Sequence, residues 1–110
     1  MTVPFIKAEV SRYIDDEPQP GIVECTFVDA LGQSHSFIEK TAIVSTEVLL
    51  ATTAYPVACE LACEIEAEWA DQDGSPLVRV CTELPWGIES ITGETRFIVR
   101  PAQLLHEAAA

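Results

Sequence analysis

The strongest chemical feature of this chain is a run of acidic side chains with no lysine or arginine among them. Six of them fall within fourteen residues: Glu60, Glu64, Glu66, Glu68, Asp71 and Asp73. Such a cluster suits docking of a basic protein, which it attracts and steers at long range. The plainer alternative is a solvated strand face that keeps a sheet edge from pairing with other chains. Glu64 and Glu66 are spaced as a general acid and base would be, but an open sheet face leaves both solvated.

Nucleophilic catalysis finds little support in the sequence. The two histidines are His35, expected beside a turn and half exposed, and His106 near the C-terminus. A pair of Cys25 and His35 across one hairpin is within reach, but no orienting third residue or glycine-rich oxyanion element accompanies it. No serine shows the Gly-x-Ser-x-Gly pattern of an activated nucleophile. The sequence therefore predicts a protein that is not an enzyme.

Four cysteines raise the question of a disulfide or a metal site. Cys59 and Cys63 lie on a predicted strand, where residues four apart are about 13 Å apart at ~3.3 Å per residue. A disulfide needs a Cα separation under about 7 Å, and one zinc ion needs both sulfurs at about 2.3 Å. No Cys-x-x-Cys or His-x₃₋₅-His spacing is present. We therefore expect no metal, no cofactor, and reduced cysteines in or near the core.

Two aromatic residues are further candidates for partner binding. They are Trp86, in the segment Pro-Trp-Gly, and Tyr55, which precedes Pro56. A tryptophan on a loop often anchors an interface, because its large surface is buried on binding. The alternative for Trp86 is that it closes one end of a β-barrel. The predicted partner-binding set is therefore the acidic cluster together with Tyr55 and Trp86.

The acidic cluster lies in a segment with a regular alternation. Over residues 57–69 every odd position is apolar, which is typical of a strand with one face on a core and one in water. Residues 71–74 then form a predicted turn, and residues 76–81 the returning strand. This turn implies three cross-strand pairs: Ile65 with Val80, Ala67 with Val78, and Glu66 with Arg79 as an ion pair. Trp69 is expected on the core face.

Further strands are expected on both sides of this hairpin. Their predicted ranges are residues 3–13, 22–30, 34–40, 42–45 and 94–100. A short helix is expected over 47–50, capped by Thr46, and a frayed one over 101–110. The turn at 29–32 is similar in sequence to that at 71–74, so two similar hairpins are expected. About six to seven antiparallel strands indicate an all-β fold, a small closed or nearly closed barrel with one short helix.

Composition bounds both the fold and the partner. The chain has 110 residues, 48% of them hydrophobic, which fits a single domain over 1–110. Eighteen acidic and six basic residues give a net charge of −12, which repels a nucleic-acid duplex or an anionic membrane and attracts a basic partner. Solubility alone is the alternative explanation. No apolar run is long enough for a membrane span, and the N-terminus lacks a signal-peptide pattern, so we expect a cytoplasmic protein.

Two short segments resemble the C-terminal β-barrel of Tu-type elongation factors. Residues 5–10, Phe-Ile-Lys-Ala-Glu-Val, are similar to the opening strand of that barrel. Leu84-Pro85 and residues 93–100, Gly-Glu-Thr-Arg-Phe-Ile-Val-Arg, are similar to its closing strands. The resemblance implies a Greek-key barrel that helps to hold aminoacyl-tRNA. The basic and aromatic segment that touches tRNA in that family has no counterpart in this sequence. A phosphate-binding loop is also missing from it.

These features predict a small acidic protein that binds a basic protein partner, as an inhibitor or an immunity protein does. Docking would begin with electrostatic steering by the acidic face and be completed by Trp86 as an aromatic anchor. The alternative is a structural or ligand-binding barrel related to translation factors, in which the charge serves solubility. Edge strands of such a fold also leave room for a homodimer.

Overall fold

The structure is a computed structural model that describes residues 3–107. In chain order its elements are β1 (Val3–Asp15), β2 (Ile22–Val28), β3 (Ser34–Lys40), α1 (Thr41–Val44), β4 (Val57–Ala62), β5 (Glu64–Ala70), β6 (Pro76–Cys81), β7 (Arg96–Val99), the 3₁₀ helix η1 (Pro101–Gln103) and β8 (Leu104–Glu107). The expectation of a mostly β protein with one short α-helix is confirmed over this range. Among these elements there is no helix with the length and apolar character needed to cross a membrane.

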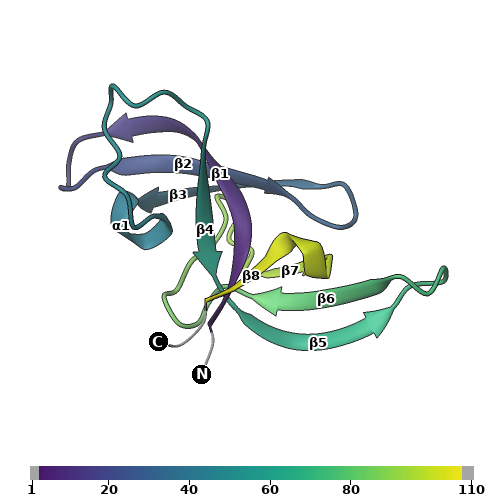
Figure 1. Cartoon of the computed structure of the whole chain (residues 1–110). Helices are drawn as coiled ribbons and strands as arrows, with labels where there is room; N and C mark the ends of the chain where they lie inside the picture. Colours follow the sequence, from purple (N-terminus) through teal and green to yellow (C-terminus); the bar gives the residue numbers. More distant parts are fainter. Residues whose placement is uncertain (1–2, 108–110) are drawn as a thin grey trace.

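The first sheet runs in the order β3-β2-β1-β4, and β8 also pairs with β1 (Figure 1). All of these pairings are antiparallel. The predicted alternation holds on β1, where Ile6, Ala8 and Val10 are buried and the intervening Lys7 and Glu9 are exposed. Each strand of this kind removes one apolar face from water, which stabilises the sheet on the core.

The second sheet runs in the order β5-β6-β7 and is also antiparallel. Its inner face carries Val78 and Val80 of β6 and Phe97 and Val99 of β7, all of them buried. These side chains join residues of the first sheet in one hydrophobic core. Figure 1 shows β5, β6 and their connecting turn projecting away from the first sheet. We call this hairpin, residues 64–81, the arm.

No closed barrel is detected among the described residues, whose strands form two separate sheets. The strand predicted over 57–69 is interrupted at Cys63, so that β4 belongs to the first sheet and β5 to the second. The backbone N–H of Cys63 donates to the carbonyl of Pro4 at 3.1 Å and holds this corner against the start of β1. A strand that passes from one sheet to another keeps its period of two, so alternation alone does not reveal the corner.

A β-bulge at Glu66 shifts the register of the arm by one residue. The pairs on either side of it are Ile65 with Val80, Ala67 with Arg79, Glu68 with Val78, and Trp69 with Leu77. The predicted pair of Ile65 with Val80 is confirmed, and that of Ala67 with Val78 is wrong. Because cross-strand partners share one face of a sheet, the bulge places Trp69 on the outer face and not on the core.

Two short elements differ from expectation. The helix α1 lies at Thr41–Val44, where a strand was predicted, and residues 47–50 are not helical. Residues 101–107 form η1 and β8, and β8 pairs with the start of β1, where a frayed helix was predicted. Residues 108–110 of that tail lie outside the described residues. The secondary structure of such a segment is determined by pairing with a distant strand, and its local sequence does not reveal that pairing.

Three turns, which begin at Asp29, Asp71 and Ser90, share one hydrogen-bond pattern. In each, the backbone N–H of the first residue donates to the carbonyl four positions later, and its own carbonyl accepts from a glycine three positions later. The first side chain also accepts from the backbone N–H groups two and four positions later. Gly32 and Gly74 have positive φ angles of 84° and 81°, which other residues disfavour. The similarity of the two predicted turns is confirmed, and the turn at Ser90 is a third.

Candidate functional site

The acidic residues predicted to bind a partner do not form one continuous patch. Those on the arm are Glu64, Glu66, Glu68, Asp71 and Asp73. Glu60 lies on β4 in the first sheet, opposite Lys7 of β1. Every residue of β5 except the partly buried Ala67 is exposed, and β5 is an edge strand of the second sheet. Most of the predicted surface is therefore on the arm.

Arginines that are distant in sequence neutralise two of the arm carboxylates. Oε1 of Glu66 lies 3.3 Å from Nε of Arg79 and 3.1 Å from Nε of Arg96. Oδ2 of Asp71 accepts from Nη1 of Arg100 at 3.2 Å. The hydrogen bond and the charge of Glu66 raise the pKa of Arg96 above its ordinary value. The predicted Glu66–Arg79 ion pair is confirmed. The other two pairs depend on Arg96 of β7 and on Arg100, which directly follows that strand.

The remaining arm carboxylates, Glu64, Glu68 and Asp73, are exposed and form no ion pair with any residue of the described range. Glu64 faces Cys81 and Glu68 faces Val78, three residues apart on β6, so the two side chains lie on opposite faces of the sheet. The outer edge of β5 has no partner strand within residues 3–107. Its backbone groups are therefore open to an extended segment of another chain.

Trp69 is a functional candidate that the sequence pattern concealed. Its side chain is 40% exposed and faces Leu77 on the outer face of the second sheet. Glu64 lies on the same outer face, since its partner Cys81 shares the parity of Leu77 on β6. The sequence contains no signal for the bulge that turns Trp69 outward. An exposed tryptophan on the same sheet face as a free carboxylate is a suitable interface anchor.

Trp86 and Glu60 both line a surface pocket of about 310 Å³, together with Phe5, Val44 and Leu105. Trp86 is 50% exposed, and its ring stands edge-on to Phe5 with the ring centroids 6.3 Å apart. The half-exposed ring is therefore not a buried plug. It borders a pocket that one face of a partner could enter.

Tyr55 lies apart from the other predicted binding residues. Its hydroxyl donates to the carbonyl of Leu50 at 2.7 Å, and its ring packs half-buried against the core. In Figure 1 the loop between α1 and β4, which contains Tyr55, lies at the end of the molecule opposite the tip of the arm. This hydrogen bond stabilises the loop itself, and Tyr55 does not line the pocket that Trp86 borders.

All four cysteines are buried and carry free thiols. Burial, with a smaller contribution from Cys81, raises the pKa of Cys63 to about 12. A hydrogen bond with Cys59, together with burial, raises the pKa of Cys25. The nucleophilic thiolate form is therefore disfavoured at these two positions. The ring nitrogens of His35 face carboxylates and not Cys25, so the pair considered from the sequence is not formed.

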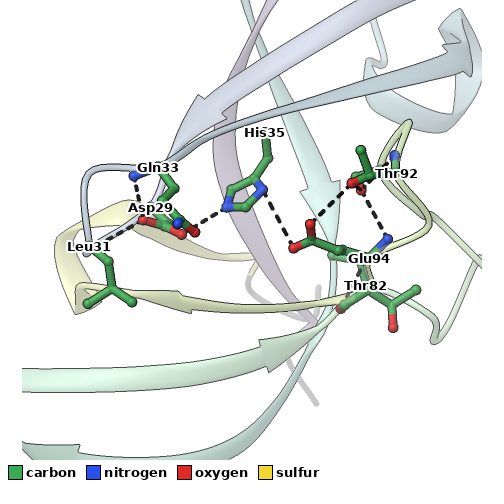
Figure 2. A network of polar contacts seen from close by, with 9 residues as sticks. Asp29, Leu31, Gln33, His35, Thr82, Thr92 and Glu94 are labelled. Atoms are coloured by element: carbon green, nitrogen blue, oxygen red, sulfur yellow. Dashed lines mark hydrogen bonds and ion pairs between the residues drawn. The ribbon is translucent and has the colours of Figure 1, made fainter.

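His35 and Asp29 form a buried polar pair that the sequence did not reveal (Figure 2). Expected to be half exposed, His35 is 8% exposed and packs against the rings of Phe27 and Phe97. Its Nε2 lies 2.8 Å from Oδ2 of Asp29. Its Nδ1 lies 3.9 Å from Oε2 of Glu94. The imidazole is thus held between two carboxylates that come from two different turns.

The turn that begins at Asp29 positions the first of these carboxylates. Oδ1 accepts from the backbone N–H groups of Leu31 and Gln33, each at 2.9 Å, which leaves Oδ2 to His35. Burial alone would raise the pKa of Asp29, but the hydrogen bonds from His35 and from these backbone groups outweigh it and hold the pKa below its ordinary value. An ionised carboxylate only accepts hydrogen bonds, so we assign the proton of the pair to Nε2 of His35.

The turn that begins at Ser90 positions the second carboxylate. Oγ1 of Thr92 donates to Oε1 of Glu94 at 3.1 Å, so that Oε2 is the oxygen nearer to the ring. A polar surface cavity of about 430 Å³ opens at this point and is lined by His35, Glu94 and the hydroxyl-bearing Ser36, Ser90 and Thr92. The two turns therefore converge on one buried histidine at the wall of a polar cavity.

Within residues 3–107, no group of three or more histidine, cysteine, aspartate or glutamate side chains converges as a metal centre. No family model, no curated protein and no solved structure matches this chain. Its function is therefore argued from the geometry and charge of its own surfaces.

Proposed function

We propose that this chain is a non-catalytic binding protein that docks a basic protein partner on the arm. The observation that supports this most is the free outer edge of β5, flanked by the carboxylates of Glu64 and Glu68, with Asp73 at the tip. The net charge of −12 adds long-range attraction for a basic partner. Trp69 supplies an exposed aromatic surface for docking. A role as an inhibitor or an immunity protein fits this mode, and free buried thiols favour a cytoplasmic location.

The partner segment that best fits this edge is extended and rich in lysine or arginine. It would add to the second sheet beside β5 through main-chain hydrogen bonds. Its side chains alternate between faces, so cationic ones would reach Glu64 on one face and Glu68 on the other. A second copy of this chain is a poorer occupant, because two β5 edges would bring like charges together. Glu60 and Trp86 would take part only with a partner that extends past the corner at Cys63.

The proposal is tested with a fluorescent peptide that repeats two lysines and two valines, so that both faces of the extended strand carry lysine. It is titrated with the full chain at several salt concentrations. The arm variant combines three neutralising changes: Glu64→Gln, Glu68→Gln and Asp73→Asn. We expect it to bind the peptide about tenfold more weakly, because each exposed charge pair contributes a few tenths to one kcal/mol. Binding to the unchanged protein should also weaken as salt increases.

A matched control removes the same charge elsewhere. It combines Glu9→Gln, Glu17→Gln and Glu47→Gln, all at exposed positions outside the arm. This control should lose less than about twofold in affinity, since only the general attraction by net charge is reduced. Equal losses in the two variants would show that the peptide responds to net charge alone, and the docking proposal would then fail.

A ligand-binding β-domain related to the barrels of translation factors is the second candidate, with the charge serving solubility. It is favoured by the pocket of about 310 Å³ beside Phe5 and Trp86, and by the location of the similar segments on β1 and β7. Filter binding of tRNA and of ribosomal particles to the full chain distinguishes the two functions. Retention that Trp86→Ala abolishes and the arm variant leaves unchanged would favour this second candidate.

A further inference from the structure

The outward face of the first sheet carries an apolar cluster at the start of β1. The neighbouring Ile6 is fully buried in the core, so Phe5 points to the opposite side of the sheet. Leu105 of β8 pairs with Phe5 and shares this face. Phe5 is only 8% exposed there, and the ring of Trp86 stands edge-on to it. Apolar side chains therefore cover one another on a face that meets water further along β1.

This cluster is not closed, and it borders the pocket of about 310 Å³. Ile43 and Val44 of α1 line the pocket together with the apolar residues of the cluster. Its volume lies at the lower end of the range of small-molecule sites, about 300–1,000 Å³. Trp86 and Leu105 are still 50% and 38% exposed. A ligand with an apolar body would remove more of this surface from water, which favours binding.

Glu60 gives the pocket its charge. It pairs with Lys7 across β4 and β1, and both residues are exposed on the outward face of the sheet. No ion pair joins Glu60 to any side chain of residues 3–107. Of the described residues that line the pocket, none is a lysine, an arginine or a histidine. The site therefore presents one negative charge beside an apolar surface, which favours a cation over an anion of the same shape.

We propose that this pocket binds a small organic ammonium compound with an aromatic or alkyl body. The body packs against Phe5 and Leu105, and the ammonium group pairs with the carboxylate of Glu60. The exposed ring of Trp86 attracts the same positive charge through its quadrupole. None of the residues that line the pocket belongs to the arm, so this site is independent of docking there.

Two hydroxyl groups complete the hydrogen bonding of the ammonium. Ser45 and Thr46 follow α1 and line the pocket. Oγ of Ser45 accepts from the backbone N–H of Glu47 at 3.0 Å and retains a second lone pair for the ligand. An ammonium group has three N–H donors, so it can bond to Glu60 and to a hydroxyl at the same time. A carboxylate head group has no donor to offer to Glu60.

Three probes that share a phenyl ring and a four-carbon chain test the site: phenylbutylamine, phenylbutanol and phenylbutanoate. Amide NMR of the full chain at neutral pH, where the amine is charged, locates each probe and measures its Kd. The amine should bind about two- to fivefold more tightly than the alcohol, as expected for an exposed ion pair, and the carboxylate should bind most weakly. The signals of Trp86 and Leu105 should shift, and those of the arm should not.

Two variants with the same loss of charge separate the pocket from the overall field. Glu60→Gln should abolish the preference for the amine and leave the affinity for the alcohol unchanged. Glu9→Gln is the matched control, because Glu9 is exposed on β1 and does not line this pocket. That control should keep the preference. Trp86→Ala should weaken binding of all three probes about tenfold, since the ring contacts the body that they share.

A preference for the amine that survives Glu60→Gln would overturn the proposal, as would equal affinity for the amine and the carboxylate. Shifts confined to the arm, or no shift at Trp86 with the amine at millimolar concentration, would also overturn it. Tighter binding of N-acetyl-lysine amide, which has no aromatic body, would assign the pocket to a lysine of a protein partner instead. The arm variant should bind the amine as the unchanged protein does, so failure of this proposal and failure of docking on the arm are distinguishable.

Discussion

The turns that begin at Asp29 and at Asp71 have the same sequence pattern and the same backbone hydrogen bonds, yet their side chains serve different ends. In both, Oδ1 accepts from two backbone N–H groups. Oδ2 of Asp29 then meets His35 at 2.8 Å in the buried interior, whereas Oδ2 of Asp71 meets Arg100 at 3.2 Å on the surface. The local sequence is sufficient to form the turn, whereas the surrounding structure determines which partner Oδ2 of the aspartate contacts.

In both turns the pKa of the first aspartate is shifted in the same direction, downward. Burial opposes ionisation of Asp71, but the backbone N–H of Ser75, the guanidinium of Arg100 and the backbone N–H of Asp73 together hold its pKa below the ordinary value. The pKa of Asp29 is also lowered, with His35 in the place of the arginine. The difference lies in what is left behind when the carboxylate is removed, a buried imidazole in one turn and a solvated guanidinium in the other.

The largest expected effect is therefore a difference in stability between Asp29→Ala and Asp71→Ala. Asp29→Ala should lower the free energy of unfolding by about 2–4 kcal/mol, because it leaves His35 buried without its partner. Asp71→Ala loses the same backbone contacts but leaves Arg100 in water, so its loss should be clearly smaller. Urea denaturation of both variants measures the difference. Equal losses would mean that the turn contacts dominate and that the buried pair adds nothing.

The glycines of the two turns should sharpen the comparison by behaving alike. An added Cβ at Gly32 or Gly74 meets no atom within 4 Å, and both residues have a left-handed backbone. Gly32→Ala and Gly74→Ala should each cost about 1–2 kcal/mol, because backbone strain is the only penalty and it is local. Chemical denaturation checks this. A much larger loss at Gly32 would indicate that the geometry of its turn is coupled to the core.

The smallest expected effect is in the dependence of stability on pH. A carboxyl whose folded pKa lies below its unfolded value stabilises the protein above the unfolded pKa, and this contribution is lost as the pH falls through the folded pKa. The chain should therefore lose stability below about pH 4. Asp29→Asn should reduce this loss of stability at low pH more than Asp71→Asn does, since Asp29 is the more buried of the two. Unfolding curves measured across this pH range provide the check. The same dependence of stability on pH in both variants would contradict the prediction.

Much of the first sheet follows from local pattern. Ile6, Ala8 and Val10 alternate with charged residues, and a single buried face is the physical cause of that alternation. The Asp-x-x-Gly turns are predictable for a related reason, because aspartate can accept from its own turn and glycine tolerates a positive φ. These features depend on neighbours within a few residues.

The second sheet was harder to predict, because its geometry depends on contacts between distant segments. Neither the corner at Cys63 nor the bulge at Glu66 interrupts the period of two in the sequence. The corner nevertheless moves the chain from the first sheet to the second, and the bulge moves the following side chains to the other face. The bulge is stabilised where Arg79 and Arg96 meet Glu66, and Arg96 is thirty residues away. The location of Trp69 and of the free carboxylates on the arm follows from these contacts, so the partner-binding set could be predicted only in part.

The amino-acid order alone was sufficient for the β class, the two similar turns and the excess of acidic charge. These properties depend on side-chain type and short-range spacing, which the order of residues states directly. Tertiary packing decided that the sheets remain separate, that three arginines neutralise the arm in part, and that His35 lies between Asp29 and Glu94. Each of these depends on which distant segments are adjacent in space. The sequence around a carboxylate or an imidazole does not indicate which side chain it will contact in the fold.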